Sequence, residues 1–224
     1  LAVMKLAKEK NKIVMLSGPA SMRITNEDCN AVTALWTYDT YSLASGTGQA
    51  VVKEGGDSWF FITADYNFGH SLEKETADMV RAAGGKVLGA VRHPFPSADF
   101  SSYLLQAQSS GAKVIGLANA GADLVTSIKQ AREFGIMDKQ RMAGMLITLN
   151  EIHTLGLQNT QGIYLTEAFY WDLNAETRAW SRRFFEKMKR MPNMVQAGVY
   201  SAITHYLKAV KAAGTEGRRR GRAK

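Results

Sequence analysis

The feature that most constrains the fold is a regular alternation of short apolar runs with longer segments of helical period. The runs have the length of buried strands, and short turns separate them from the segments that follow. Neighbouring parallel strands need a crossover between them, so this order predicts an α/β fold with a parallel sheet flanked by helices. We expect strands over residues 12–17, 58–64, 86–91, 113–117, 141–147 and 162–168, and helices over 40–53, 70–83, 100–109, 122–134, 151–155, 175–191 and 200–213.

The composition is that of an ordinary globular chain. Of 224 residues, 46% are apolar and 21% are charged, and no apolar run approaches the ~18 residues of a transmembrane helix. The first ten residues, LAVMKLAKEK, lack the long apolar core of a signal peptide and are typical of the end of an amphipathic helix. Cys29 is the single cysteine, which fits the cytoplasm without excluding the periplasm.

The positive charge is concentrated at the end of the chain. Four arginines and a lysine stand among residues 218–224, and without these five charges the net charge of +8 falls to +3. The rest of the chain is therefore no basic surface for nucleic acid, and we expect no nucleic-acid partner. The tail itself has two interpretations, a truncation or reading-frame artefact and a flexible basic tail.

Patterns for metal or cofactor binding are missing. The four histidines, His70, His93, His153 and His205, form no metal-ligand pair and are expected in loops or on the surface. Gly46-x-Gly48 lacks the third glycine of a dinucleotide loop and is expected to serve helix packing. We therefore expect neither a metal nor a cofactor.

Catalytic patterns are also weak. Ser17-Gly18 is not preceded by the glycine of a nucleophile elbow. Asp65 and His70 are close in sequence, but we expect them on opposite sides of a strand-to-helix turn, with Asp65 in the loop and His70 in the first helical turn. The sequence therefore predicts a protein that is not an enzyme.

The segment WFFITADYNFG, residues 59–69, indicates a binding site instead. A buried strand delivers Tyr66 and Phe68 to a loop before a helix, and in open α/β sheets ligands lie beyond such strand ends. Aromatic walls with a few polar groups suit a small organic ligand.

Two loops of small residues could hold an anionic group through backbone N–H donors: Pro19, Ala20 and Ser21 after the first strand, and Asn119, Ala120 and Gly121 after the strand 113–117. Simple tight turns are an equally good interpretation of each. A further group of aromatic residues, 169–171, includes Tyr170. We expect these residues either to contact a ligand or to pack in the core.

These segments resemble a known family. The motifs WTYDTYSLASGTG, FFITADYNFGHSLE, HPFPSADFSSYLLQAQ, GLANAGAD and IKQAREFGI follow one another in the order found in type I periplasmic binding proteins of branched-chain amino acid ABC transporters. The resemblance covers about residues 12–213 and is greatest to the subgroup for aromatic acids and amides.

The resemblance implies two α/β lobes with ligand between them. Residues 1–38 and 172–224 would form part of the first lobe, which is incomplete, and residues 39–171 the second. Ligand positions of the family fall on Ser21, with Pro19 and Ala20 beside it, on Phe68 with Tyr66 nearby, and on Asn119, Ala120 and Gly121. The acidic residue that pairs an α-ammonium group falls near Leu146, which cannot make that pair.

The function that the resemblance implies is solute binding outside the cytoplasm. The ligand would be a small carboxylate or amide with an aromatic or branched apolar body, and the partner an inner-membrane ABC permease, with no insertion of this chain into the membrane. A periplasmic location is implied, although no signal peptide stands in this sequence. The alternatives are the ligand-sensing module of a regulator with the same fold and, less well supported, an enzyme on a similar scaffold.

Overall fold

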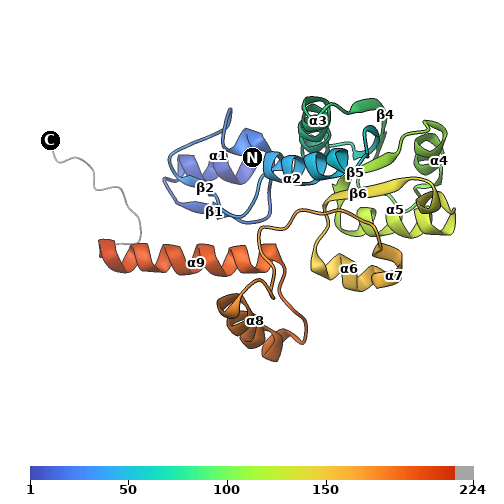
Figure 1. Ribbon diagram of the computed structural model, residues 1–224. Helices are drawn as coiled ribbons and strands as arrows, with labels where there is room; N and C mark the ends of the chain where they lie inside the picture. Colours follow the sequence, from blue (N-terminus) through green and yellow to red (C-terminus); the bar gives the residue numbers. More distant parts are fainter. Residues whose placement is uncertain (215–224) are drawn as a thin grey trace. The chain divides into compact units, whose positions relative to one another are not determined.

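A computed structural model describes residues 1–214, which form two compact units (Figure 1). Unit 1 comprises residues 1–39 and the chain from 168 onward, and unit 2 comprises residues 40–167. The predicted lobe boundaries, 38/39 and 171/172, lie close to these limits. That each unit corresponds to a lobe of the family stays a prediction. The predicted arginine-rich tail lies outside the described residues.

Unit 2 contains a four-stranded parallel sheet in the order β4-β3-β5-β6. The strands are β3 (Ser58–Ala64), β4 (Lys86–His93), β5 (Val114–Ala120) and β6 (Arg141–Leu146). The helices are α2 (Thr40–Lys53), α3 (Asn67–Ala82), α4 (Ser101–Ser109), α5 (Gly121–Glu133), α6 (Leu149–Leu155) and α7 (Leu157–Thr160), with a 3₁₀ turn η2 at Ile136–Asp138. The α/β class with a parallel sheet flanked by helices is therefore confirmed.

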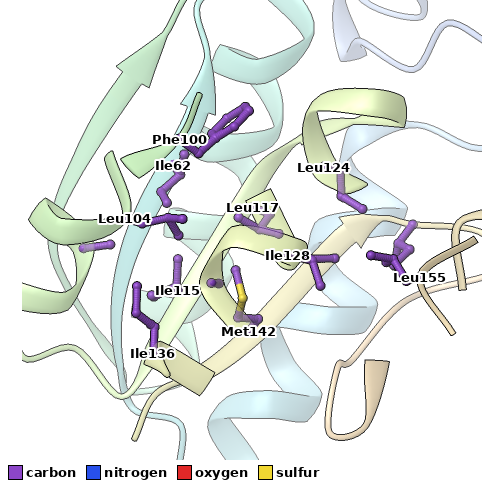
Figure 2. Packing of buried hydrophobic residues seen from close by; sticks show 13 residues of the cluster. Ile62, Phe100, Leu104, Ile115, Leu117, Leu124, Ile128, Ile136, Met142 and Leu155 are labelled. Carbon is purple, nitrogen blue, oxygen red and sulfur yellow. The ribbon is translucent and has the colours of Figure 1, made fainter. Parts of the chain in front are cut away.

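The main core of unit 2 lies between the sheet and the pair α4 and α5. Figure 2 shows Ile62 of β3, Leu117 of β5 and Met142 of β6 packed against Leu104 and Ile128 of the two helices. Each of these side chains is at most 1% exposed. Burial of side chains of this size contributes about 1.5–3 kcal/mol each, so this apolar layer stabilises the sheet that carries the strand ends.

The other face of the sheet is covered by α3, which approaches the strands closely at Gly69. A Cβ atom at this position would lie 2.1 Å from the carbonyl oxygen of Ala64 and 3.1 Å from that of Ala118. Only glycine allows the first turn of α3 to sit this close to the ends of β3 and β5. The same contact fixes Tyr66, the N-cap of α3, and Phe68, which lies in the first turn of α3 and not in the loop that the sequence predicts.

Unit 1 is built from α1 (Ala2–Glu9), β1 (Val14–Leu16), η1 (Met22–Ile24), β2 (Thr33–Leu35), α8 (Ala175–Met188) and α9 (Met194–Ala213). The strands β1 and β2 pair in parallel. Helix α9 lies close to the chain after β2, since a Cβ atom at Gly198 would be 2.1 Å from Thr37 Oγ1. Nearby, Trp36 donates a hydrogen bond of 3.2 Å to Ser201 Oγ.

Several expected bounds differ from the structure, since the helix expected over 70–83 begins at Asn67 and the helix expected over 175–191 ends at Met188. Two differences are larger. The prediction of a strand over residues 162–168 is wrong, because this segment makes only an isolated bridge, between Tyr164 and Ala143. Side chains hold it instead: the Tyr164 hydroxyl contacts Glu54, and Thr166 Oγ1 lies 2.9 Å from Thr47 Oγ1. The last helix begins at residue 194 rather than 200, because Asn193 caps it by accepting from the next backbone N–H groups.

The bounds of α2 and β3 are those predicted, and the close packing expected of the two helix glycines is found at Gly46. A Cβ atom at Gly46 would meet Thr166 Oγ1 at 2.4 Å. At Gly48, in contrast, the nearest atom would be Met79 Cβ at 3.5 Å, which is ordinary contact. The two positions, although both helical, therefore differ in how much side chain they tolerate.

The replacement Gly69→Ala is expected to lower the free energy of unfolding by about 1–3 kcal/mol, because the new methyl group overlaps backbone that cannot move independently. Chemical denaturation measures the change. Gly48→Ala is the matched control in a helix of the same unit, and it should be neutral or stabilising by about 0.5–1 kcal/mol from helix propensity. Equal effects of the two substitutions would contradict the close approach at Gly69.

Candidate ligand-binding site

The carboxyl ends of the unit 2 strands bring most of the predicted site residues to one edge. Tyr66 follows β3, Gly121 follows β5, and Leu146 ends β6. The neighbours β3 and β5 connect onward in opposite directions along the sheet, because β3 leads to the edge strand β4 and β5 leads to β6. Ligands of open α/β sheets bind at such a switch point.

Exposed aromatic rings stand at this edge. The centroids of Tyr66 and Phe68 are 5.9 Å apart, and those of Tyr66 and Phe95 are 5.0 Å apart. Tyr66 is 38% exposed and Phe95 is 57% exposed. The sequence reasoning missed Phe95, although it follows β4, the neighbour of β3, in a loop rich in turn residues.

The Tyr66 hydroxyl is suited to donate a hydrogen bond. Burial raises the pKa of its phenol, and the negative charge of Asp123 raises this pKa further. The group therefore stays protonated at neutral pH and well above it.

A buried polar network lies beside the strand ends, and it includes the predicted residue Asn119. Asn119 Nδ2 donates to Ser127 Oγ at 3.1 Å, and Ser127 Oγ donates to the Asp123 carbonyl at 2.6 Å. Asn119 Nδ2 also lies 3.3 Å from His93 Nε2. All four residues are at most 2% exposed, so the expectation that each histidine lies in a loop or on the surface is wrong for His93.

The network determines which nitrogen of His93 carries the proton. Nδ1 lies 2.9 Å from the Pro94 carbonyl oxygen, which only accepts, so Nδ1 donates. Nε2 faces the amide donor of Asn119, so Nε2 accepts. The neutral Nδ1–H tautomer therefore satisfies both partners.

The expected loop at Asn119, Ala120 and Gly121 is wrong as secondary structure. β5 continues through Ala120, and α5 begins at once with Gly121 at a φ of 61°. Asn119 is consequently a buried strand residue whose side-chain oxygen has no hydrogen-bond partner among residues 1–214. Ala120 and Gly121 keep their predicted place at the switch point, and ligand contact by any of the three stays a prediction.

Leu146 lies beside this point because it pairs with Ala120 across β5 and β6. The next acidic residue along the chain, Glu151, is held in the cap of α6, where its Oε2 accepts from the Thr148 backbone N–H at 2.9 Å. It is therefore engaged in capping and is no substitute for the acidic residue missing at Leu146.

The remaining predicted residues lie in unit 1. Pro19, Ala20 and Ser21 follow β1, as expected. Ala20 is only 2% exposed, and the Ser21 hydroxyl caps η1 by accepting from the Arg23 N–H at 3.4 Å. Tyr170 is half exposed and its ring lies 5.8 Å from that of Trp171. Contact of these residues with a ligand stays a prediction.

One expectation about Asp65 and His70 is wrong. His70 Nε2 lies 2.7 Å from Asp65 Oδ1, because the strand-to-helix turn brings both side chains to the same side. Both are exposed, and such an ion pair contributes little to stability. Within residues 1–214 no cluster of His, Cys, Asp and Glu could hold a metal ion, and no helix there is long and apolar enough to span a membrane.

The model of the periplasmic binding protein family matches residues 1–224. The chain belongs to this family. Members of this family are periplasmic binding proteins and not enzymes, and on that basis the prediction that the chain is not an enzyme is confirmed. A search of curated proteins finds no match.

Solved periplasmic binding proteins are closely similar. One from Burkholderia mallei shares 53% sequence identity at a TM-score of 0.93, covering 96% of this chain and 57% of its own. A periplasmic ligand-binding protein of a branched-chain amino acid ABC transporter from Burkholderia xenovorans shares 37% identity at a TM-score of 0.83, covering 96% and 58%. A benzoate-bound solute-binding protein of an ABC transporter from Rhodopseudomonas palustris, at 20% identity and a TM-score of 0.88, covers 96% and 60% and shows the shared fold.

These findings confirm the resemblance to periplasmic binding proteins of the branched-chain amino acid transporter type. The chain spans somewhat less than two thirds of the length of these solved relatives. This share agrees with the expectation that the first lobe is incomplete.

The buried network makes a prediction for Ser127→Ala. Removal of the hydroxyl leaves Asn119 Nδ2 with one partner fewer and the Asp123 carbonyl without this donor, so we expect a loss of about 1–3 kcal/mol in unfolding free energy. Denaturation with urea measures it. The neighbouring Thr126→Ala is the control, because its exposed hydroxyl donates only to the Ala122 carbonyl within α5. A Ser127→Ala protein as stable as the control would contradict the network.

Proposed function

We propose that this chain is the ligand-binding part of a periplasmic solute-binding protein that serves an ABC importer. The ligand is a small carboxylate or amide with an aromatic or branched apolar body. The partner is an inner-membrane permease, and the resemblance implies that two lobes close over the ligand, a shift between open and closed populations. Family membership supports the solute-binding role, and the ligand class and partner are our proposal.

One observation supports this ligand class. Aromatic side chains stand at the strand ends, and an apolar residue stands where amino acid binders of the family have an acidic one. Tyr66 and Phe68 offer ring faces at the switch point. Leu146, beside Ala120, cannot pair an ammonium group, and leaving such a charge unpaired in a closed site costs several kcal/mol. An anion or amide without an amino group avoids this cost.

The anionic end of the ligand has donors at the same edge. Helix α3 begins at the switch point, at Asn67, and its first turn holds no acidic residue, whereas the first turn of α5 holds Asp123. The first N–H groups of α3 lack partners within the helix and favour negative charge. The benzoate-bound relative from Rhodopseudomonas palustris suggests benzoate as a probe.

Isothermal titration calorimetry on the chain tests the ligand class with benzoate, benzamide and leucine. We expect heat of binding with benzoate or benzamide and none with leucine at the same concentrations, since leucine brings an ammonium group without a partner. Tight binding of leucine, with no heat of binding for benzoate or benzamide, would contradict the proposal.

The variant Leu146→Glu tests the same site by charge. A carboxylate there should weaken benzoate binding about tenfold through like-charge repulsion at the edge, and the effect should shrink as salt is added. Leu88→Glu is the control, because Leu88 is an exposed residue of the edge strand β4. Equal benzoate affinities of the two variants would place the ligand away from Leu146.

A further inference from the structure

Phe95 combines high exposure with a firmly held backbone. Phe95 is 57% exposed, although burial of a phenylalanine side chain would stabilise the fold. The loop that carries it is anchored at both ends, before the ring by the hydrogen bond from His93 Nδ1 to the Pro94 carbonyl and after it by Asp123. A loop shaped for packing alone would bury its largest apolar side chain.

The anchor on Asp123 is made of groups that are costly to bury. Both carboxylate oxygens of Asp123 lie 3.3 Å from the Ser97 backbone nitrogen, which donates to them. Asp123 is 2% exposed and belongs to α5, whereas Ser97 follows β4. A buried carboxylate without compensating hydrogen bonds is strongly unfavourable, so the Ser97 N–H holds the loop in register with α5.

The ring of Phe95 is placed against Tyr66. Their centroids are 5.0 Å apart and their planes are inclined by 33°. Two exposed rings from the ends of adjacent strands thus present neighbouring faces at one edge of the sheet. Aromatic rings attract a flat aromatic guest in offset or edge-to-face geometry, and they attract a puckered saturated ring less.

The charge near these rings indicates which end of a ligand they meet. Asp123 lies close enough to Tyr66 for its negative charge to raise the pKa of the phenol. The same charge disfavours a carboxylate at this pair of rings. The rings therefore meet the apolar end of the ligand.

We infer that Phe95 is a specificity-determining residue that selects a planar aromatic body over a saturated one, and that Asp123 is the positioning residue that holds its loop. This inference rests on the proposed function. It adds to that function a residue that neither the resemblance nor the solved relatives supply.

The test compares benzoate with cyclohexanecarboxylate, which has the same charge and nearly the same size but no flat ring. We expect the unaltered chain to prefer benzoate, and Phe95→Leu to weaken benzoate binding roughly three- to tenfold with little change for cyclohexanecarboxylate. Phe134→Leu is the matched control, since Phe134 is an exposed phenylalanine at the end of α5. Calorimetry gives both dissociation constants.

The variant Asp123→Asn tests the positioning role. It should reduce the preference for benzoate as Phe95→Leu does, because the amide replaces one of the two oxygens that accept from the Ser97 N–H by an NH2 donor and removes the charge from the other. The double variant should show no further loss of preference, as expected for residues that act through one another. Additive losses of preference would show that Asp123 acts independently of Phe95 and would overturn its positioning role, and an unchanged preference in Asp123→Asn would overturn it as well.

The failures of the two proposals are distinguishable. If the unaltered chain binds neither of these acids nor benzamide, the proposed function fails, and the inference fails with it. If the unaltered chain binds benzoate and Phe95→Leu keeps the full preference, the inference alone is overturned.

Discussion

The close approach of α3 to the strand ends of unit 2 is the constraint on which the candidate site depends. Gly69 lets the first turn of α3 lie against the carbonyl oxygens of Ala64 and Ala118. That contact determines where the chain leaves β3, and therefore where Tyr66 and Phe68 stand. The apolar layer on the opposite face, between the sheet and α4 and α5, keeps the strands in register beneath them.

A second constraint is the buried polar network behind the aromatic edge. His93 at the end of β4, Asn119 in β5 and Asp123 in α5 belong to three different elements and are joined by hydrogen bonds. Polar groups at these depths are tolerated because most of their hydrogen-bonding capacity is used. The network therefore fixes the loop after β4 relative to α5, while leaving the rings of Tyr66 and Phe95 exposed.

The sequence was sufficient to predict those elements whose apolar residues are regularly spaced and whose ends are marked by turn residues. The bounds of α2 and β3 follow from apolar spacing and from the turn at residues 54–57, and the order of strands and helices predicts the parallel sheet. Tyr66 and Gly121 could be placed at one edge because strands of a parallel sheet end together, whereas Leu146 was singled out by the resemblance. The resemblance added the family, which the comparisons confirm.

The remaining features depend on contacts between segments distant in sequence. The segment 162–168 has the apolar character of a strand, but its side chains bind Glu54 and Thr47 instead of extending the sheet. The burial of His93 depends on Asn119, which is 26 residues away. Phe95 was missed because a single aromatic in a loop has no period, and only the neighbouring strand end shows its place beside Tyr66.

Backbone amide mapping by nuclear magnetic resonance during a benzoate titration tests the central claim most directly, namely that ligand binds at the carboxyl edge of the unit 2 sheet. The account predicts the largest shifts at residues 66–69, 95, 97 and 120–122, at or just after the ends of β3, β4 and β5. Shifts concentrated at the opposite edge, around residues 55–57 and 111–113, with none at the carboxyl edge, would contradict it.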